Sequence, residues 1–323
     1  MLEQHSMKLI SLVVPCFNES AVFPHLKTAL TSIADELSAK FRVEIVFVDD
    51  GSKDSTWTQI CAFSEEDSRI RGVSLSRNFG HQLALTCGYD LAQGDAVVCM
   101  DADLQDPPEA IIQMAEKWQE GYDIVYAVRA KREGETVFKL LTAKLFYRIM
   151  RFLGAHNVQV DTGDFRLMSR TALDALGKMR EQHRFIRGMV GWLGFRVAEI
   201  EYERKARRAG VTKYPLKKMM RLAVDAIVSF SITPLRLSFL SAIILSAVIL
   251  GYMFYAAAKH FIIGTSLVPG WTSLIIAVVA LGAMNLISIG ILGEYVGRIY
   301  EEVKKRPLYF IKGRTSNVQQ KEN

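Results

Sequence analysis

The sequence predicts an α/β protein with a mostly parallel central sheet, followed by two transmembrane helices. Two observations predict this class. From residue 7 to about residue 200, short apolar runs of strand type alternate with stretches of helical spacing, which is typical of a parallel sheet covered by helices on both faces. Farther along, two long uncharged segments are each long enough to span the hydrocarbon core of a bilayer.

Composition sets the first limits on function. Half of the 323 residues are apolar and 23% are charged, so the chain can bury a large core and is not disordered. The net charge of +6 is modest for this length, and it does not indicate a nucleic-acid partner. The four cysteines show no CxxC or Cys/His metal spacing, which predicts reduced thiols in a cytosolic compartment.

The first apolar run is predicted to be a strand and not a secretory signal. Pro15, Asn18 and Glu19 interrupt it too early for a signal peptide, and no small-residue cleavage site follows. Met1 and Met7 are both open as the starting residue.

Five apolar runs are expected to form the sheet, and two amphipathic stretches to form helices beside it. The expected strands are residues 9–15, 43–50, 71–76, 95–101 and 122–127, and the helices are 22–41 and 108–121. In such sheets ligands bind beyond the carboxyl ends of the strands. The polar sequences CFNES, DDGSKDST, SRNFG and DADLQDPP follow those ends, so we expect the site at that edge.

Asp101 and Asp103 form the sharpest signal at this edge. They are separated by one residue, so a turn after Asp101 would bring both carboxylates to the same volume. Two hard anionic oxygen ligands suit Mg²⁺ or Mn²⁺ bound to a diphosphate. The alternative is a solvated acidic turn, in which Asp106 caps the helix that begins at PPEA. The apolar run before Asp101 favours the metal, and Asp106 is predicted to be the cap.

The sequence DDGSKDST allows two readings. Gly51 would form a tight turn, and Ser52 or Asp54 would cap the following helix. Asp50 at the strand end then remains available to bind a base or a ribose. Neither GxGxxG nor GxxxxGK[ST] occurs, which argues against a dinucleotide site or a P-loop.

The two predicted membrane spans lie at residues 237–258 and within the uncharged stretch 260–293. Residues 204–221 carry eight Lys or Arg and no acid, and the residues after the second span are also basic. The loop between the spans has only Lys259 and His260, so both termini are expected to be cytoplasmic. Residues 138–154 form an amphipathic basic helix that fits either a lipid headgroup region or an ordinary core packing.

Several motifs in order resemble one family. SLVVPCFNES, VDDGSKDST, LSRNFGHQLAL, DADLQDPPE, GDFRLMSR and RRAGVTKYP, followed by two spans and GEYVGRIYEEVKKRP, resemble the family 2 glycosyltransferases that load sugars onto polyprenyl phosphate. Bactoprenol glucosyl transferases and dolichol-phosphate mannose synthases belong to that group. The resemblance covers residue 7 to about residue 312. It implies a nucleotide-sugar-binding domain of the GT-A type, and inverting transfer from a nucleotide sugar to a membrane lipid phosphate.

The resemblance also implies roles for individual residues. Asp164 and Asp103 are the candidate catalytic residues, and Asp101 with Asp103 would hold Mg²⁺ or Mn²⁺. The residues expected to bind the donor are Pro15, Glu19, Asp50, Asp101, Gln105, Arg166, Arg207 and Lys213. Arg166 would face phosphate, and the segment with Arg207 and Lys213 would cover the donor. His81 departs from the family pattern, because relatives often carry lysine there.

The chemistry leaves the role of Asp164 open. A divalent ion with Arg and Lys can stabilise the charge on a leaving diphosphate. An alcohol acceptor would need a general base, whereas a lipid phosphate is already anionic at neutral pH. Asp164 is therefore either a base or a group that positions substrate, and a purely structural pair with Arg166 is a third reading.

Two other functions compete with this one. A processive polysaccharide synthase shares the DxD motif, but this chain lacks the QxxRW pattern of those enzymes. A non-catalytic nucleotide-sugar-binding membrane subunit is the other, although every expected acidic position is filled.

The sequence predicts four regions and a location. They are a cytoplasmic catalytic domain at 1–213, a juxtamembrane segment at 214–234, a two-helix transmembrane hairpin at 235–294 and a basic tail at 295–323. We expect a multi-pass protein of the bacterial inner membrane, with a UDP-hexose such as UDP-glucose as donor and undecaprenyl phosphate as acceptor. The identity of the sugar, the downstream glycan and assembly into a homo-oligomer stay open.

Overall fold

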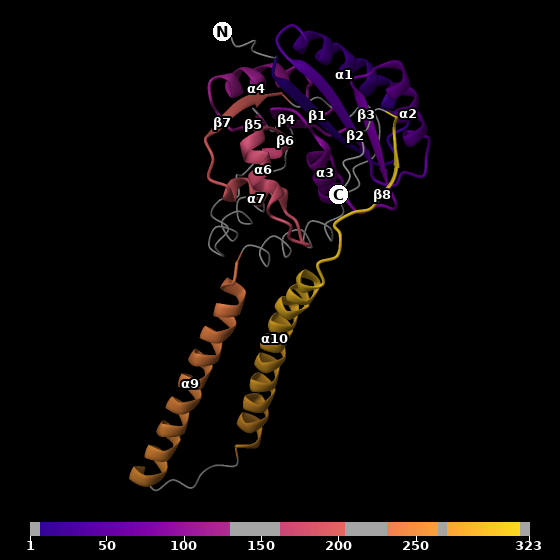
Figure 1. The fold of residues 1–323 in the computed structure, drawn as a ribbon. Helices are drawn as coiled ribbons and strands as arrows, with labels where there is room; N and C mark the ends of the chain where they lie inside the picture. The colour runs from indigo at the N-terminus through magenta and orange to yellow at the C-terminus, as the bar shows by residue number, and fades with distance from the viewer. Residues whose placement is uncertain (1–6, 130–161, 204–230, 264–269, 317–323) are drawn as a thin grey trace. The chain divides into compact units, whose positions relative to one another are not determined.

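The computed structural model describes residues 7–129, 162–203, 231–263 and 270–316 (Figure 1). The chain divides into two compact units. The first comprises residues 1–144, 157–216 and 306–323, and the second comprises residues 145–156 and 217–305. Arg207 and Lys213 lie outside the described residues, as do the amphipathic helix expected at 138–154 and the basic stretch 204–221.

The first unit is built on an eight-stranded sheet with the order β7-β5-β6-β4-β1-β2-β3-β8. The strands are β1 Leu9–Cys16, β2 Arg42–Asp49, β3 Ile70–Leu75, β4 Ala96–Cys99, β5 Ile124–Arg129, β6 Thr162–Ser169, β7 Val197–Tyr202 and β8 Ile311–Arg314. The β1–β2, β1–β4, β2–β3 and β5–β7 pairs are parallel. The β4–β6, β5–β6 and β3–β8 pairs are antiparallel. The prediction of an α/β fold with a mostly parallel sheet is confirmed.

Helices cover both faces of this sheet (Figure 1). They are α1 Phe23–Leu37, α2 Thr56–Glu66, α3 His81–Leu91, α4 Ala110–Gln119, α6 Arg170–Gly177 and α7 Ile186–Trp192. Side chains of α1, α2 and α4 join the main apolar core with alternate residues of β1, including Ile10 and Leu12. Helix α3 lies against the other face, where a Cβ added at Gly88 would lie 2.2 Å from Cγ1 of Val13. The spacing of buried residues in α1, such as Leu26, Leu30 and Ile33, is the helical one expected for residues 22–41.

A buried ion pair joins β2 and β3. Arg71 donates from Nη1 to Oε2 of Glu44 at 2.7 Å, and the two side chains are only 10% and 9% exposed. The other carboxylate oxygen of Glu44 accepts from the Ser11 hydroxyl and from the Gln93 N–H. The carboxylate therefore satisfies three donors at once, which is the arrangement that makes a buried charge tolerable.

Glu44→Ala is expected to lower the free energy of unfolding by about 3–5 kcal/mol, because it leaves the Arg71 guanidinium buried without its counter-charge. The measurement is the thermal unfolding midpoint of the full chain in detergent. Glu66→Ala is the matched control, since Glu66 is 59% exposed in its ion pair with Lys27, and exposed pairs contribute at most about 1 kcal/mol. Equal shifts in the two variants would contradict the prediction.

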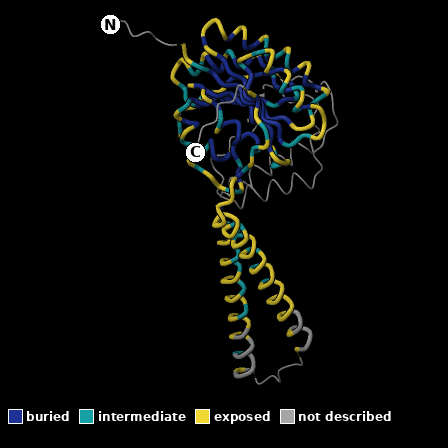
Figure 2. Tube along the Cα trace, turned by 45° about the vertical axis from the view of Figure 1, so that its right-hand side comes forward, coloured by how far each residue is buried: buried dark blue, intermediate teal, exposed yellow. Residues whose placement is uncertain are grey.

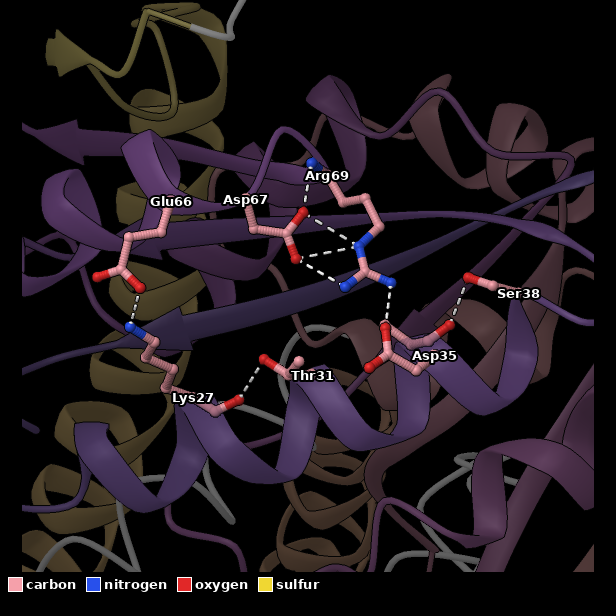
Figure 3. A network of polar contacts seen from close by, with 8 residues as sticks. Lys27, Thr31, Asp35, Ser38, Glu66, Asp67 and Arg69 are labelled. Atoms are coloured by element: carbon pink, nitrogen blue, oxygen red, sulfur yellow. Dashed lines mark hydrogen bonds and ion pairs between the residues drawn. The ribbon is translucent and has the colours of Figure 1, made fainter.

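Polar contacts also link α1 to α2 and to the turn that follows α2 (Figure 3). Arg69 binds Asp67 through Nε and Nη2 and reaches Asp35 of α1 through Nη1 at 2.8 Å. Hydrogen bonds from Arg69 are the main reason that the pKa of Asp67 lies below its usual value. Since Asp35 is 63% exposed, this contact contributes little to stability.

The second unit contains α9 Thr233–Ile263 and α10 Trp271–Val303. The hydroxyl of Ser238 on α9 donates to the hydroxyl of Ser288 on α10 at 2.7 Å, and Tyr295 donates to the carbonyl of Ser231 at 2.6 Å. Both helices contain a stretch long and apolar enough to cross a membrane, Thr233–Tyr252 and Ala277–Val303. Most of their described residues are exposed (Figure 2), including Phe254 at 79%. The two expected helices are confirmed, and their crossing of a membrane stays a prediction.

Candidate active site

The candidate site lies at the edge of the sheet where β1, β2, β3 and β4 end. These strands run in the same direction, so their carboxyl ends meet at one edge, as the sequence predicted. Strand β6 runs antiparallel to β4, so its amino-terminal end arrives at this same edge. Residues that follow β4 and residues that begin β6 are therefore neighbours, although about sixty positions separate them in the sequence.

The register of β4 and β6 explains why Asp101 and Asp164 meet. Cys99 is paired with Arg166, and continuing this antiparallel register by two residues places Asp101 opposite Asp164. Because side chains alternate along a strand, Asp164 and Arg166 point to one face of the sheet. That is the face covered by α3, whose first residue is His81. The predicted association of Asp101 with Asp164 at one edge is thus a consequence of the β4–β6 pairing.

Asp164 is a carboxylate surrounded by cations. Its side chain is 4% exposed, and it accepts from Nη2 of Arg166 at 2.8 Å and from Nε and Nη2 of Arg187 at 3.0 and 2.9 Å. Nε2 of His81 lies 3.3 Å from Oδ2. Burial by itself would raise the pKa of Asp164, but the hydrogen bonds and charges of His81, Arg187 and Arg166 hold it well below its usual value. The carboxylate stays ionised and is a poor base.

The two arginines of this cluster differ in what they face. Arg166 is fully buried, and it also donates to the carbonyls of Gly163 and Asp164 at 3.3 Å. Its guanidinium carbon lies 5.7 Å from the centroid of the Tyr126 ring. Arg166 was expected to face phosphate; in the structure its guanidinium is buried against Asp164, and a contact with phosphate stays a prediction. The side chain of Arg187 is 42% exposed, so it is the arginine of this cluster that open space can reach.

His81 connects Asp164 to Asp101. Its Nε2 lies 3.6 Å from Oδ1 of Asp101 and 3.3 Å from Oδ2 of Asp164. Burial and the nearby Arg187 would lower the pKa of His81, but the two carboxylates raise it to about 9. Removal from water and the charges of Asp164, Asp106 and Asp103 raise the pKa of Asp101 to about 6, although His81 opposes this shift. Negative charge is concentrated around Asp101, which is the condition that favours a bound cation.

Asp50, an expected donor ligand, binds the loop after β3. Oδ1 accepts from the N–H of Phe79 at 2.7 Å and Oδ2 from the N–H of Gly80 at 2.9 Å. Its side chain is buried, and burial is the main reason for its raised pKa. Gly80 has a φ of 97°, a backbone conformation that favours glycine, and the next residue is His81. Asp50 therefore shapes the turn that leads to His81, and contact with a nucleoside stays a prediction.

The remaining expected residues lie on turns at the same edge. Pro15 is buried at the end of β1, opposite Val48 of β2. The N–H of Glu19 donates to Oγ1 of Thr56 at 2.9 Å. Oδ1 of Asp103 accepts from the N–H of Gln105 at 3.1 Å. These contacts place the expected donor-binding segments together, and they leave the individual assignments as predictions.

One assignment from the sequence is wrong. Asp106 was expected to cap the helix after it, but α4 begins at Ala110 with Glu109 in the cap position. The carboxylate of Asp106 is buried and accepts a hydrogen bond from the hydroxyl of Tyr202, at the end of β7. The carbonyls of Pro107 and Pro108 form the turn that precedes the helix. Asp106 thus ties the DADLQD turn to a distant strand.

Asp101 and Asp103 fit a divalent cation by their chemistry. The side chain of Asp101 is 38% exposed, and the charge of Asp103 raises its pKa. The two carboxylates therefore lie close enough to interact. Among the residues that the structure describes, no group of three or more His, Cys, Asp or Glu is placed to hold a metal ion. Two protein carboxylates would then share the cation with the oxygens of a bound diphosphate and water, which is the usual mode for Mg²⁺.

Arg187 and His81 contact Asp164, although the sequence did not predict either contact. Arg187 is the second residue of α7 and lies 23 residues after Asp164 in the sequence. No sequence motif connects these two positions. A second contact holds α7 to α3, because the N–H of Ile186 donates to Oε1 of Gln82 at 2.9 Å. The signal for His81 was its position directly after SRNFG, at the edge where strands end.

Comparison with known proteins decides the family. The family described as "Glycosyl transferase family 2" matches residues 11–177. The chain is 45% identical over 301 residues to "Uncharacterized glycosyltransferase YkcC" of Bacillus subtilis (strain 168), covering 93% of this chain and 92% of that protein. It is 40% identical over 303 residues to "Prophage bactoprenol glucosyl transferase homolog" of Escherichia coli (strain K12), covering 94% and 98%. The chain belongs to glycosyltransferase family 2.

A phage protein is a further relative. "Bactoprenol glucosyl transferase" of Shigella phage SfII is 40% identical over 303 residues, covering 94% of this chain and 97% of that protein. Among solved structures, glucosyl-3-phosphoglycerate synthase from Mycobacterium tuberculosis aligns with a TM-score of 0.47 and 20% identity, over 69% of this chain and 80% of that chain. The chain is thus a family 2 glycosyltransferase in which two apolar helices follow the region matched by the family.

Proposed function

We propose that this glycosyltransferase transfers a hexosyl group, glucose in the first instance, from UDP-glucose to a polyprenyl phosphate such as undecaprenyl phosphate. The observation that carries the proposal is the neutralisation of Asp164 by Arg166, Arg187 and His81. A carboxylate with a strongly lowered pKa is a poor proton acceptor, so the acceptor should arrive already ionised. A phosphate monoester meets this requirement, and the relatives named bactoprenol glucosyl transferase support the same class of acceptor.

The reaction needs no proton transfer in its bond-forming step. An acceptor phosphate oxygen attacks the anomeric carbon while the bond from that carbon to the UDP oxygen breaks, and its electron pair stays on the β-phosphate. The new bond forms on the opposite face of the sugar, which inverts the configuration. A divalent cation held by Asp101 and Asp103 would supply stabilisation for the charge on the leaving diphosphate.

The residues of the site would act mainly by charge and orientation. Asp164 fixes the planar fork of Arg187 through two contacts, and the side chain of Arg187 is 42% exposed. A guanidinium in this position can bind a phosphate oxygen and orient it for attack. His81, with Nε2 3.3 Å from Oδ2 of Asp164, is a further partner of that carboxylate beside Arg187. The expected roles of Arg207 and Lys213 at the donor phosphates remain part of this proposal.

The second unit fits a lipid-linked acceptor. Large apolar side chains along α9 and α10 are exposed, among them Phe239 at 70%, Phe254 at 79% and Leu286 at 72%. Leaving such surface in water is unfavourable by about 25 cal/mol per Å². We therefore propose that both helices span the bacterial inner membrane, with both termini and the glycosyltransferase unit on the cytoplasmic side.

The test is transfer by membranes that contain the full chain. Membranes are incubated with a panel of labelled nucleotide sugars and undecaprenyl phosphate, and organic-extractable label is measured. We expect glycolipid to form with UDP-glucose, to require the added lipid phosphate, and to disappear with EDTA. Mg²⁺ or Mn²⁺ added in excess of EDTA should restore it. Absence of extractable label with every donor would reject the proposal, and transfer unaffected by EDTA would reject the metal.

A further inference from the structure

The residues after α10 in the sequence complete the sheet of the first unit. Strand β8 pairs antiparallel with β3, with Val73 opposite Arg314 and Leu75 opposite Ile311 (Figure 1). Thr315 extends this pairing, because its N–H donates to the Gly72 carbonyl and its Oγ1 accepts from the Gly72 N–H, both at 2.9 Å. Residues 295–323 were expected to form a basic tail; residues 311–314 of this stretch form a strand beside β3.

The packing around this strand is tight. A Cβ added at Gly72 would lie 2.6 Å from Cγ2 of Ile60 and 2.9 Å from Cγ2 of Thr315, so glycine alone allows the approach. Leu308 and Thr315, on either side of β8, are 7% and 6% exposed. The strand is therefore held by buried contacts at both ends.

Phe310 joins this strand to the loop of residues 76–80. Its carbonyl accepts from the N–H of Ser76 at 2.9 Å, and its ring centroid lies 6.4 Å from that of Phe79. The guanidinium of Arg77 covers the Phe79 ring at 4.1 Å. The loop therefore contacts both Phe310 and Asp50. Asp50 accepts from the N–H groups of Phe79 and Gly80.

A neighbouring contact holds the far end of the helix that follows this loop. The hydroxyl of Tyr309 donates to Oδ2 of Asp90 at 2.8 Å, and Nη1 of Arg180 lies 2.9 Å from both carboxylate oxygens. Asp90 lies at the carboxyl end of α3, the helix that His81 begins. Tyr309 and Phe310 therefore contact α3 near its last turn and the loop before its first turn.

We propose that the C-terminal segment 308–315 is a positioning element for donor binding, acting through Phe310 on the loop 76–80 and through that loop on Asp50, which accepts from the N–H groups of Phe79 and Gly80. The inference rests on the proposed function, because its test measures the KM values for UDP-glucose and for the lipid phosphate. Loss of the Phe310 ring should free Phe79 and loosen the loop that Asp50 binds, while Arg187, proposed to orient the acceptor phosphate, stays held by Asp164. The contacts of Phe310 that carry the proposal are with Ser76 and Phe79, so its effect passes through the loop.

The experiment compares Phe310→Ala, Phe310→Tyr and Lys312→Ala in the full chain in detergent. Lys312 is an exposed residue of the same strand, which makes it the matched control. Hydrogen exchange of the amides in residues 76–80 is measured first. Donor and acceptor KM values are then measured separately, each with the other substrate saturating. Phe310→Ala should speed loop exchange and raise the KM for UDP-glucose roughly three- to tenfold, the range expected for losing one aromatic pair. The acceptor KM should be unchanged.

The controls decide between positioning and general structural damage. Phe310→Tyr keeps the ring and should restore the donor KM, and Lys312→Ala should leave both KM values unchanged. Unchanged loop exchange in Phe310→Ala would overturn the inference, and so would an equal rise of both KM values. If the wild-type chain transfers no sugar, the proposed function fails, and loop exchange alone then decides whether the strand holds the loop.

Discussion

Asp103→Asn is expected to reduce kcat for sugar transfer by at least about a thousandfold, because it removes one of the two carboxylates proposed to hold the cation at the leaving diphosphate. Asp103 lies on a turn after β4, and its contact with the Gln105 N–H can be kept by the amide oxygen of asparagine. The variant should therefore fold, insert into membranes and unfold at the temperature of the wild type.

Metal titration makes this prediction specific. The concentration of Mn²⁺ or Mg²⁺ that gives half-maximal activity should rise in Asp103→Asn, since one anionic ligand has been lost. Asp35→Asn is the matched control. It removes the same negative charge from α1, where the Asp35 side chain is 63% exposed. More than a tenth of wild-type activity in Asp103→Asn at every metal concentration would remove Asp103 from the site.

The strands that the sequence predicted are apolar runs, whereas the strands β6 and β8, which it did not predict, carry charged or polar residues. Strands β1 to β5 are apolar runs, so burial on both faces can be read from composition. Strand β6 is also buried, but it carries Asp164 and Arg166, whose charges satisfy one another only in the folded chain. Strand β8 is short and polar, and its partner β3 lies more than two hundred residues earlier. Long-range pairing of this kind leaves no local pattern.

The part of the candidate site that follows parallel strands was predictable from the sequence. The part that depends on the direction of β6 was not. The polar segments after parallel strands were expected at one edge, and Asp101, Asp103, Asp50 and Glu19 lie there. The antiparallel direction of β6 could not be derived from alternating strands and helices, yet it is what brings Asp164 to Asp101. Arg187 depends on a further step, the docking of α7 beside β6, and no motif in the sequence signals it.

Asp164→Asn is expected to keep only a low residual activity and to be unstable, with a fall of about 3–5 kcal/mol in the free energy of unfolding, because Arg166 would remain fully buried without a counter-charge. The pH dependence follows from the lowered pKa of Asp164. Its contribution to stability is fully present above the ordinary carboxyl pKa of about 4, and it is lost only as the pH falls from there through the lower folded-state value. Activity between pH 6 and 8 should show no titration from this group.

Arg187→Met tests how Asp164 acts without the same damage to the fold, since Arg187 is 42% exposed. If Asp164 serves chiefly to orient Arg187, then Arg187→Met should lower kcat/KM about a hundred- to a thousandfold, and Arg187→Lys should recover little because it cannot make both contacts.

The double variant completes the cycle. Asp164→Asn with Arg187→Met should be no slower than Asp164→Asn alone, because each substitution disables the same unit and such effects are not additive. A general base would give a different result: Arg187→Met would keep most of its activity, Asp164→Asn would be inactive, and wild-type activity would fall with a single titration near neutral pH. That outcome would also remove the reason for choosing an acceptor that is already ionised, so this comparison tests the substrate class as well as the residue.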